Sequence, residues 1–518
     1  MITRRELLSG VAATVGAQLF PSSEFDFIVV GAGASGCVLA NRLTADGSTR
    51  VLLLEAGAPP ANPNIAVPGA WTTLAGTDVD WAYRTEPEPA LNQRRINWPR
   101  GKTYGGSSAI SAMAHTRGHQ LDYDAWGAAA GAGWNFAALL PWFRRSEDNA
   151  RGASDMRGAG GPLRVEDTRD PNAAHLAFLG AAREAGYAAD PEFDFNGPRQ
   201  ENGAGFHQKT RRGAKRVSVA DAYLSPALSR TNLVVRPSAL VHRVVIEAGR
   251  AVGVEFSVGS AKQIVRARRE VVIAAGVIET PKLLMLSGIG PATALSALNI
   301  PVVVDCAEVG RNLQDHPRVP VRWQATQPIA GSSVTAGLFT HSRGRAAVGS
   351  PDIHFYVGRG LAQPDPFITI TAALGQPRSR GSITLQSADP SAKPLIHANY
   401  FSAPEDLDAM LEAVRIAQSL GESRAFASIR GARVLPGPDV TTAEGLRAHI
   451  RATAETMFHQ VGSCRMGRDA GSVVDPELRV RGVANLRIAD GSIMPSVINA
   501  PTNWTCVVIG EKAAELLV

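Results

Sequence analysis

Apolar residues first gather in a short run at Phe25–Val30, and this run ends in a glycine-rich stretch at residues 31–36. The run shows no helical period, which is typical of a buried strand in a parallel sheet. A helix-like stretch at residues 37–45 follows, and then a second apolar run at Val51–Leu54 that closes on Glu55. This order predicts a β-α-β unit and therefore an α/β fold built on a parallel sheet.

The middle of the chain alternates between β-prone runs and less regular segments. Several apolar runs between residues 233 and 274 are separated by turn residues, and they predict a meander that returns to the first sheet. Strands at residues 353–357 and 367–370 and an amphipathic helix at about 404–420 predict a second region of mixed structure. The segment 157–214 is rich in Gly and Arg and shows only weak periodicity.

Length and composition limit the possible classes of protein. The chain has 518 residues, of which 45% are hydrophobic and 19% are charged, so it is neither disordered nor collagenous nor a coiled coil. Its length and the absence of repeats or low-complexity linkers favour a discontinuous two-domain fold. No apolar stretch reaches the roughly 18 to 20 residues that a bilayer requires, so we expect no stable membrane span.

Charge and cysteine content argue against two further kinds of site. Lys and Arg number 53 against 47 Asp and Glu, but the Arg residues are scattered, so no nucleic-acid partner is expected. The four cysteines, Cys37, Cys306, Cys464 and Cys506, lie far apart and form no cluster with histidines at zinc spacing. We therefore expect neither a disulfide framework nor a metal site.

The N-terminal segment has a pattern of its own. Residues 1–20 combine a charged start, which contains Arg4 and Arg5, with a mild apolar run and a small-residue step at residues 15–17. This pattern resembles a twin-arginine export signal, and the alternative is a frayed N-terminal helix. Export would place the protein in the periplasm, and without it the protein would be cytoplasmic.

The glycine-rich loop after the first strand has the spacing of a dinucleotide-binding motif. Gly31 permits a tight turn, Gly33 lets the backbone approach a pyrophosphate, and Gly36 allows the next helix to pack closely on the strand. Free N–H groups and the helix dipole favour an anion there. Glu55 ends the second strand, where a carboxylate can accept the ribose hydroxyls. The loop by itself does not distinguish FAD from NAD.

Further blocks of sequence carry a family resemblance. They occupy residues 98–110 (WPRGKTYGGSSAI), 122–126 (DYDAW), 276–291 (GVIETPKLLMLSGIGP), 309–316 (VGRNLQDH), 458–467 (FHQVGSCRMG) and 490–495 (DGSIMP). In this order the blocks resemble those of the glucose-methanol-choline (GMC) family of flavoprotein oxidoreductases. The resemblance extends from residue 25 to residue 518.

The resemblance implies FAD as the cofactor and oxidation of a primary or secondary alcohol to an aldehyde or ketone. It implies a Rossmann-like FAD-binding domain, whose parallel sheet contains the β-α-β unit, and a discontinuous α+β substrate domain with an antiparallel sheet. Hydride would pass from the alcohol to flavin N5, and then electrons to oxygen, a quinone or a cytochrome. The expected division is 25–156, 215–310 and 455–518 for FAD, 157–214 and 311–454 for substrate, and 1–24 as a signal or disordered segment.

His459 stands in the block where the family keeps its catalytic histidine, so the resemblance implies that it is the general base. An imidazole suits this role because it titrates near neutral pH. The family's second catalytic position, His or Asn in most relatives, falls on Pro501, which has neither a polar side chain nor an N–H. Either His459 acts alone, or a local shift brings Asn499 or Asn503 into this position.

Most of the residues predicted to bind FAD lie in loops. A glycine-serine loop supplies backbone and hydroxyl donors, and a helix that starts near Thr502 points its positive end at the flavin. Ser111 replaces an Asn of the relatives, while Ala109 and Ile110 stand near the position of a histidine in relatives with covalent FAD, so we expect non-covalent FAD. The predicted set is Gly31, Gly33, Ser35, Gly36, Glu55, Ala56, Arg100, Gly105, Gly106, Ser107, Ser108, Ser111, Val241, Asp490, Gly491 and Thr502.

The substrate is less well defined by the sequence. Pro501 also occurs in the pyridoxine 4-oxidase branch, which would favour a heteroaromatic alcohol, but that branch has a second histidine where this chain has Met457. His354 and Tyr356 share one face of a predicted strand, so they either face the cavity or lie half-exposed at a sheet edge. Trp504 and Phe458 are further candidates for the pocket. The alternative function is that of a non-redox relative, similar to the hydroxynitrile lyases or the fatty acid photodecarboxylase.

Overall fold

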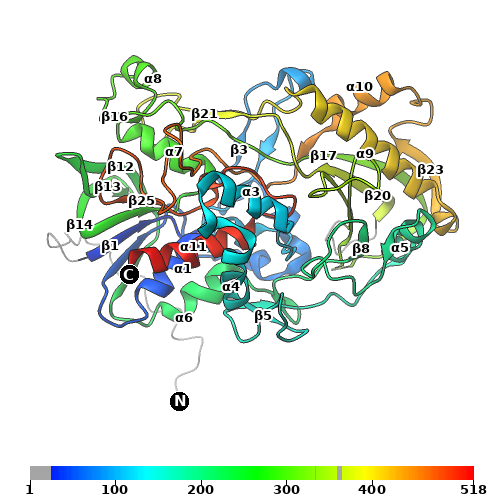
Figure 1. The fold of residues 1–518 in the computed structure, drawn as a ribbon, viewed down its shortest axis with the longest axis horizontal. Helices are drawn as coiled ribbons and strands as arrows, with labels where there is room; N and C mark the ends of the chain where they lie inside the picture. Colours follow the sequence, from blue (N-terminus) through cyan, green and yellow to red (C-terminus); the bar gives the residue numbers. More distant parts are fainter. Residues whose placement is uncertain (1–24, 333, 359–364) are drawn as a thin grey trace.

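The computed structural model describes residues 25–332, 334–358 and 365–518, so the predicted export signal lies outside the described residues. Within these ranges the chain forms two large sheets that lie side by side (Figure 1). Each sheet contributes to its own apolar core, and segments that are distant in sequence meet in both cores. The predicted α/β class, with a parallel sheet and an antiparallel sheet, is confirmed.

The first sheet contains the predicted β-α-β unit. β1 (Phe25–Val30) pairs in parallel with β2 (Val51–Leu54) and with β14 (Ala261–Ile273). Both apolar runs are almost completely buried, which explains why they alternate so little along the chain. The strand order is β11-β2-β1-β14-β13-β12 with β25 beside β14, and the remaining bounds are β11 (Leu233–Arg236), β12 (Ala239–Glu247), β13 (Arg250–Val258) and β25 (Leu486–Ile488).

β14 is much longer than its apolar run at residues 271–274 indicates. Its first half pairs antiparallel with β13 in the predicted meander, and its second half pairs in parallel with β1 and β25. The first half is mostly polar and exposed or partly buried, so it has no apolar run to mark it. One strand therefore joins the meander to the parallel sheet.

α1 (Ala34–Leu43) packs on the first sheet, and α11 (Asn503–Leu517) packs against α1 (Figure 1). Arg42 donates to both carboxylate oxygens of Glu511 at 2.9 and 2.7 Å. Ser35 Oγ donates to the backbone oxygen of Cys506 at 2.7 Å. These contacts hold the N-terminal end of α11 beside the glycine loop.

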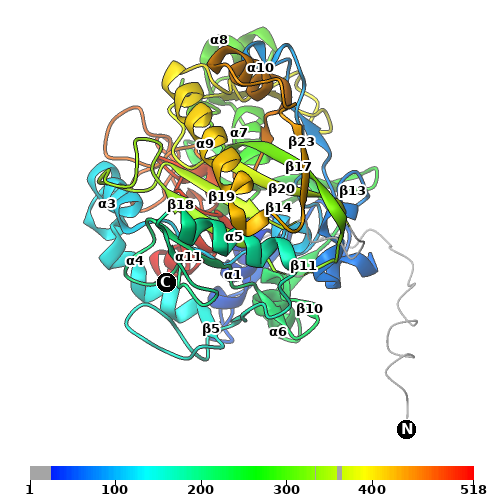
Figure 2. The same cartoon turned by 90° about the vertical axis from the view of Figure 1, so that its right-hand side faces the viewer.

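The second sheet is antiparallel except for one short pair, β7 with β8. Two helices, α9 (Pro404–Glu422) and α5 (Ala173–Glu184), cover one of its faces (Figure 2). The first extends the predicted helix by two residues, whereas the second lies in a segment whose weak periodicity predicted no helix. The strand order is β23-β17-β20-β19-β18-β8-β7 with β24 beside β17, and the bounds are β7 (Ala188–Ala189), β8 (Gly203–Phe206), β17 (Pro317–Ile329), β18 (Ala336–Thr340), β19 (Ile353–Val357), β20 (Asp365–Leu374), β23 (Arg430–Leu435) and β24 (Glu455–Thr456).

β19 is an internal strand, because it pairs with both β18 and β20. All five of its residues are buried, so the alternative that His354 and Tyr356 lie half-exposed at a sheet edge is wrong. Tyr356 stands opposite Thr371 on β20, and directly paired residues of neighbouring strands share a face. This face of the sheet is turned away from α9 and toward the cavity described below.

The remaining elements connect the two sheets and cover their edges. The other helices are α2 (Ser107–Ile110), α3 (Gln120–Ala130), α4 (Phe136–Ser146), α6 (Ser225–Ala227), α7 (Gly276–Leu286), α8 (Ala292–Ala297) and α10 (Ala443–Thr453). The other strands are β3 (Tyr83–Arg84), β4 (Asn97–Trp98), β5 (Glu147–Asn149), β6 (Leu163–Val165), β9 (Arg211–Arg212), β10 (Lys215–Arg216), β15 (Ile289–Gly290), β16 (Val304–Asp305), β21 (Ser382–Thr384) and β22 (Leu395–His397). In the described part of the chain, no helix combines the length and apolar character needed to cross a bilayer. The same residues contain no group of three or more His, Cys, Asp or Glu that could hold a metal ion.

Candidate active site

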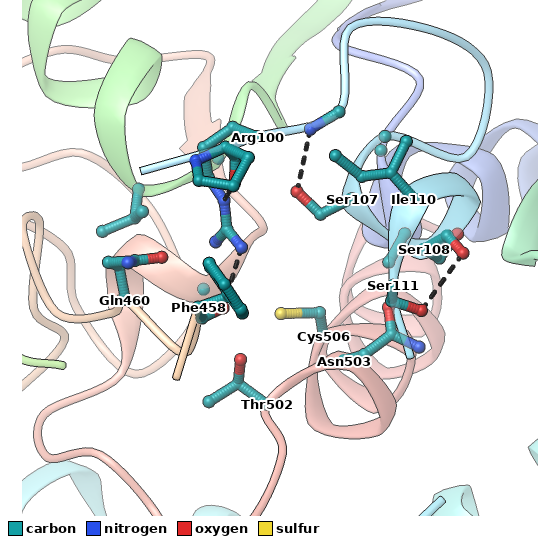
Figure 3. A pocket seen from close by; sticks show the side chains of 18 of the residues that line it. Arg100, Ser107, Ser108, Ile110, Ser111, Phe458, Gln460, Thr502, Asn503 and Cys506 are labelled. Atoms are coloured by element: carbon teal, nitrogen blue, oxygen red, sulfur yellow. Dashed lines mark hydrogen bonds between the residues drawn. The ribbon is translucent and has the colours of Figure 1, made fainter. Parts of the chain in front are cut away.

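A cavity of about 560 Å³ is lined by residues of both large sheets and of the loops around them. The glycine loop at residues 31–35, the loop at 99–114, the segment 457–460 and the first residues of α11 all contribute to its wall. Figure 3 shows the serines of the loop 99–114 on one side, Phe458 on the other, and the start of α11 below them. The fold thus brings together at this cavity four of the sequence blocks that carry the family resemblance, those at 98–110, 276–291, 458–467 and 490–495.

The part of the cavity next to β1 fits the pyrophosphate of a dinucleotide. Gly31 has a φ of +100°, and a Cβ at this position would lie 2.6 Å from the backbone oxygen of Ala274. A Cβ on Gly106 would lie 2.9 Å from the Cα of Gly33, so the two glycine loops meet backbone to backbone. Gly33 caps α1 without a side-chain acceptor, which leaves the first N–H groups of this helix available to an anion.

Glu55 lies in the cavity wall at the end of β2, as a ribose-binding carboxylate should. Its Oε2 accepts from the N–H of Ala32 at 2.8 Å, and its Oε1 accepts from the N–H of Gly57 at 2.7 Å. Burial raises the pKa of Glu55 to about 7. The backbone donors fix the orientation of the carboxylate and leave further lone pairs for the hydroxyls of a ligand.

The glycine-serine loop is held in place by its own hydroxyl groups. Ser108 Oγ donates to the backbone oxygen of Gly105 at 2.6 Å and accepts from the N–H of Val219 at 3.0 Å. Ser107 Oγ accepts from the N–H of Gly101 at 3.2 Å (Figure 3). Ser111 Oγ donates to the backbone oxygen of Ser108 at 3.3 Å, as Figure 3 also shows. The loop therefore presents a preformed wall to the cavity.

His459 reaches the cavity from the segment that follows β24. Its backbone N–H donates to Asp315 Oδ1 at 2.9 Å, and its Nδ1 lies 3.0 Å from the Nδ1 of His316. One of these two ring nitrogens carries the hydrogen and the other accepts it. Among the described residues Nε2 of His459 has no hydrogen-bond partner, so it is the ring nitrogen that remains for a ligand.

The surroundings of His459 keep its imidazole neutral. Burial lowers its pKa well below the usual 6.5, and the positive charges of Arg100 and Arg318, together with His354, lower it further. A neutral imidazole can accept a proton, so the site holds its histidine in the form that a general base requires.

Asp315 and Arg100 support the segment that carries His459. Oδ2 of Asp315 accepts from the hydroxyl of Tyr400 and from Nε2 of Gln460, the latter at 3.3 Å. Arg100 Nη2 donates to the backbone oxygen of Phe458 at 2.8 Å (Figure 3). Burial raises the pKa of Asp315 to about 6. These bonds fix the backbone on both sides of the histidine.

The structure separates the three residues considered for the second catalytic position. Pro501 and Asn503 line the cavity, whereas Asn499 is completely buried outside it. Oδ1 of Asn499 accepts from the N–H of His119 at 3.0 Å, and its Nδ2 donates to Gln200 Oε1 at 2.8 Å. Asn499 is thus engaged in the protein interior, while the side chain of Asn503 has no hydrogen-bond partner among the described residues.

Most residues of the predicted site do meet around this cavity. The exceptions are Asn499, Gly36 and Gly105. A Cβ on Gly36 would lie 1.9 Å from the backbone oxygen of Gly31, so this glycine allows the helix to pack closely on the loop. The predicted residues that line the cavity are Gly31, Gly33, Ser35, Glu55, Ala56, Arg100, Gly106, Ser107, Ser108, Ser111, Val241, His459, Asp490, Gly491, Pro501 and Thr502.

Three residues of the site were not singled out from the sequence. Asp315 and His316 stand in the block 309–316, which carried the resemblance but gave no role to its individual residues. Lys209 lines the cavity although it lies in a segment with weak periodicity, where a lysine is normally read as solvated. The family blocks could have identified the first two, and the sequence held no signal for the third.

Comparison with known proteins gives consistent matches along the chain. Family models described as GMC oxidoreductase match residues 25–318 and 377–510. Mitochondrial choline dehydrogenase from Mus musculus is 39% identical, over 98% of this chain and 91% of that protein. The oxygen-dependent choline dehydrogenase of Brucella anthropi is also 39% identical, over 95% of each chain.

Solved structures show the same relationship. The pyridoxine 4-oxidase structure from Mesorbium loti matches with a TM-score of 0.89 and 31% identity, over 95% of this chain and 98% of that one. A formate oxidase from Aspergillus oryzae matches with a TM-score of 0.88 and 26% identity, over 96% of this chain and 98% of that one. The similarity therefore covers nearly the whole chain and includes both large sheets.

Proposed function

The chain belongs to the GMC oxidoreductase family and is an FAD-dependent oxidoreductase that acts on CH–OH donors, and we propose that His459 is its general base. The proposed reaction converts a primary or secondary alcohol to an aldehyde or ketone. The observation that carries this proposal is the position of His459, whose Nδ1 faces His316 at 3.0 Å and whose Nε2 is left for a ligand.

Different residues of the cavity would bind different parts of FAD. The glycine loop and the N-terminus of α1 would hold the pyrophosphate, Glu55 would accept the ribose hydroxyls, and the start of α11 would face the flavin. When bound, FAD supplies the acceptor for the hydride that leaves the alcohol carbon. The backbone-to-backbone contact of Gly33 and Gly106 supports this assignment, because a side chain on Gly106 would collide with Gly33 and push the two loops of the cavity wall apart.

His459 would take the hydroxyl proton of the alcohol at Nε2. For Nε2 to accept a proton, Nδ1 must carry the ring hydrogen and donate it to Nδ1 of His316. His316 therefore sets the tautomer of the base and the orientation of its ring. The main-chain bond from His459 to Asp315 holds the base in place, so proton uptake requires no movement of the backbone.

We propose that FAD is bound without a covalent link. Ala109 and Ile110 have side chains that cannot attach to a flavin, and burial raises the pKa of the Cys506 thiol in the cavity wall to about 12. A thiol with this pKa is a poor nucleophile at neutral pH. Acid precipitation should therefore release all of the flavin into the supernatant, and flavin that stays with the protein would contradict the proposal.

The identity of the alcohol is a separate proposal. The choline dehydrogenases suggest an amino alcohol and the pyridoxine 4-oxidase suggests a heteroaromatic alcohol, and Pro501 in the cavity wall agrees with the second. We propose a primary alcohol on an aromatic or short aliphatic frame.

The test of the function is an anaerobic titration of the purified yellow protein with aliphatic, benzylic, pyridyl and sugar alcohols. Loss of the flavin absorbance near about 450 nm with one of these classes would support alcohol oxidation. Admission of air would then distinguish oxygen from a quinone or cytochrome as the acceptor. If no alcohol bleaches the flavin although FAD is bound, the protein is instead a non-redox member of the family.

A further inference from the structure

Lys209 is a buried cation in the cavity wall that lacks an acidic partner. Its side chain lines the cavity, and the residue is only 4% exposed. Its backbone exchanges two hydrogen bonds of 2.9 Å with Glu166, so the main chain fixes its position. Among the described residues, no carboxylate lies within 4.0 Å of its ammonium nitrogen. Burying an unpaired charge is costly, so the position calls for a counter-charge from elsewhere.

Two further polar groups of this region lack partners, one on Tyr356 in the cavity wall and one on His207 outside it. The hydroxyl of Tyr356 and the Nε2 of His207 are buried and have no hydrogen-bond partner in the described part of the chain. The two rings lie 5.2 Å apart, and Lys209 is close enough to His207 to lower the pKa of its imidazole. Buried polar groups normally have partners, so an ammonium group and a hydroxyl that both lack one in the same cavity wall indicate a binding site for a polar ligand.

The carboxylates of the cavity wall are all engaged by donors of the protein. They are Glu55, which accepts from Ala32 and Gly57; Glu279, which accepts from Tyr83 at 2.6 Å and Lys282 at 3.0 Å; and Asp490, which accepts from Gly276 at 2.9 Å and Thr280 at 2.6 Å. Two further cations line the wall: Arg318, which bonds Glu455 at 2.9 Å in a partly exposed pair, and Arg100, which donates to the backbone oxygens of Pro99 and Phe458. The wall therefore offers an ammonium group that has no carboxylate partner, whereas each of its carboxylates already accepts hydrogen bonds from the protein.

We propose that the alcohol substrate carries a carboxylate, which pairs with the ammonium group of Lys209 and accepts a hydrogen bond from the hydroxyl of Tyr356. The inference rests on the proposed alcohol oxidation and names its substrate class. A cationic alcohol such as choline would meet Lys209 and Arg318 without a free carboxylate to stabilise it, so it is a poor substrate. The anion holds the far end of the molecule while His459 receives the hydroxyl proton.

The protonation of Lys209 gives the proposal a signature in pH. Burial lowers its pKa to about 8; the positive charges of Arg211 and Arg216 lower it further, and Asp170 opposes them. Two histidines lie near this lysine, and burial lowers the pKa of His207 to about 3 and that of His175 to about 4, so both are neutral above pH 6. Lys209 is thus the group near the anion site that titrates around pH 8.

The experiment measures kcat/KM for flavin reduction with matched alcohols on the FAD-loaded enzyme. One set consists of 4-(hydroxymethyl)benzoate, benzyl alcohol and 4-(hydroxymethyl)phenyltrimethylammonium, and a shorter set of 4-hydroxybutanoate, 1-butanol and choline. In each set we expect the anion to exceed the neutral alcohol by about tenfold or more, and the cation to be poorest. Lys209→Met should lower kcat/KM for the anion about 100-fold and leave the neutral alcohol within about threefold.

Three further measurements distinguish binding from a structural role. Lys512→Met, which removes a half-buried lysine outside the cavity, should leave every ratio unchanged. Tyr356→Phe should lower kcat/KM for the anion about tenfold. For the native enzyme, kcat/KM for the anion should fall as pH rises through about 8, and Lys209→Arg should move this fall to higher pH.

The possible results separate this proposal from the proposed function. Equal kcat/KM for anion and neutral alcohol, or an FAD-loaded Lys209→Met variant that keeps the native ratio between substrates, would overturn the carboxylate site while leaving alcohol oxidation intact. A preference for the cation would also overturn it. If no alcohol of any charge reduces the flavin, the proposed function itself has failed.

Discussion

The substitution His459→Ala tests the proposed general base directly. The structure predicts that it removes the base without removing the cofactor site, because the bond from His459 to Asp315 is made by the main chain and survives the change. The predicted FAD contacts come from other segments, chiefly the glycine loop and the start of α11. Bound FAD and its absorption spectrum should therefore be preserved, while the rate of flavin reduction falls.

The size of the loss follows from the environment of the imidazole. A positioned general base contributes about 10² to 10⁴ in rate, and the contribution falls when the pKa of the base lies below the working pH. Burial and Arg100 lower the pKa of His459 well below 6.5, so the expected loss lies at the lower end, about 100-fold. At about 1.36 kcal/mol per factor of ten, this loss corresponds to about 2.7 kcal/mol of activation free energy.

The assay is anaerobic stopped-flow reduction with a neutral alcohol, followed by flavin absorbance near about 450 nm. His397→Ala is the matched control, since His397 lies on β22 and does not line the cavity. Added imidazole should restore part of the rate in His459→Ala and change nothing in the control. A rate for His459→Ala within about threefold of the native enzyme, with FAD fully bound, would refute the assignment.

Three other predictions concern the pH dependence of the base, the retention of FAD and the role of Asn499. With a neutral alcohol, flavin reduction should slow as pH falls, with an apparent pKa below 6.5, because protonated His459 cannot accept a proton; a pH profile with this pKa above 7 would contradict the environment described for the base. Glu55→Gln should weaken FAD retention about ten- to 100-fold in a fluorescence dilution assay. The amide has only one acceptor oxygen, whereas the N–H groups of Ala32 and Gly57 bond the two oxygens of the carboxylate, and full retention would argue against a ribose contact. Asn499→Ala should lower the free energy of unfolding by about 2 to 4 kcal/mol and leave flavin reduction nearly unchanged, because the Asn499 side chain bonds His119 and Gln200. A variant that reduces flavin slowly but shows native stability in a denaturant titration would instead indicate that Asn499 takes part in the reaction.

The sequence predicted those elements of the fold whose burial is uniform. Phe25–Val30 and Val51–Leu54 are apolar on both faces, so they stand out without reference to any partner. The first half of β14 is partly exposed and mixed in character, and its pairing depends on β13, so its pattern alone did not identify it. α5 is rich in alanine and its moderate apolar stripe is covered by α9 and the second sheet, which are distant in sequence.

In the site, too, the sequence predicted features formed within one short segment but not contacts between distant segments. The glycine loop is local, and its spacing alone indicated a dinucleotide. The pair of His316 and His459 joins residues 143 positions apart, and no pattern in either block gives the distance between their rings. Lys209 is buried only because the second sheet and the loop at 99–114 close over it, and these contacts exist only in the folded protein.

The ion pair between Arg42 and Glu511 has a consequence for the time course of synthesis. These residues are 469 positions apart, and ribosomes add about 5 to 20 residues per second. α1 therefore waits for roughly 25 to 95 s on the ribosome before its partner helix exists, with apolar side chains that α11 later covers still uncovered. The glycine loop cannot acquire its final wall during this interval, so loading of the cofactor must come after translation of α11. A cell that makes this protein has to shield the nascent β1–α1 unit for roughly 25 to 95 s, so we expect the expression yield to depend on chaperone supply and on the rate of elongation.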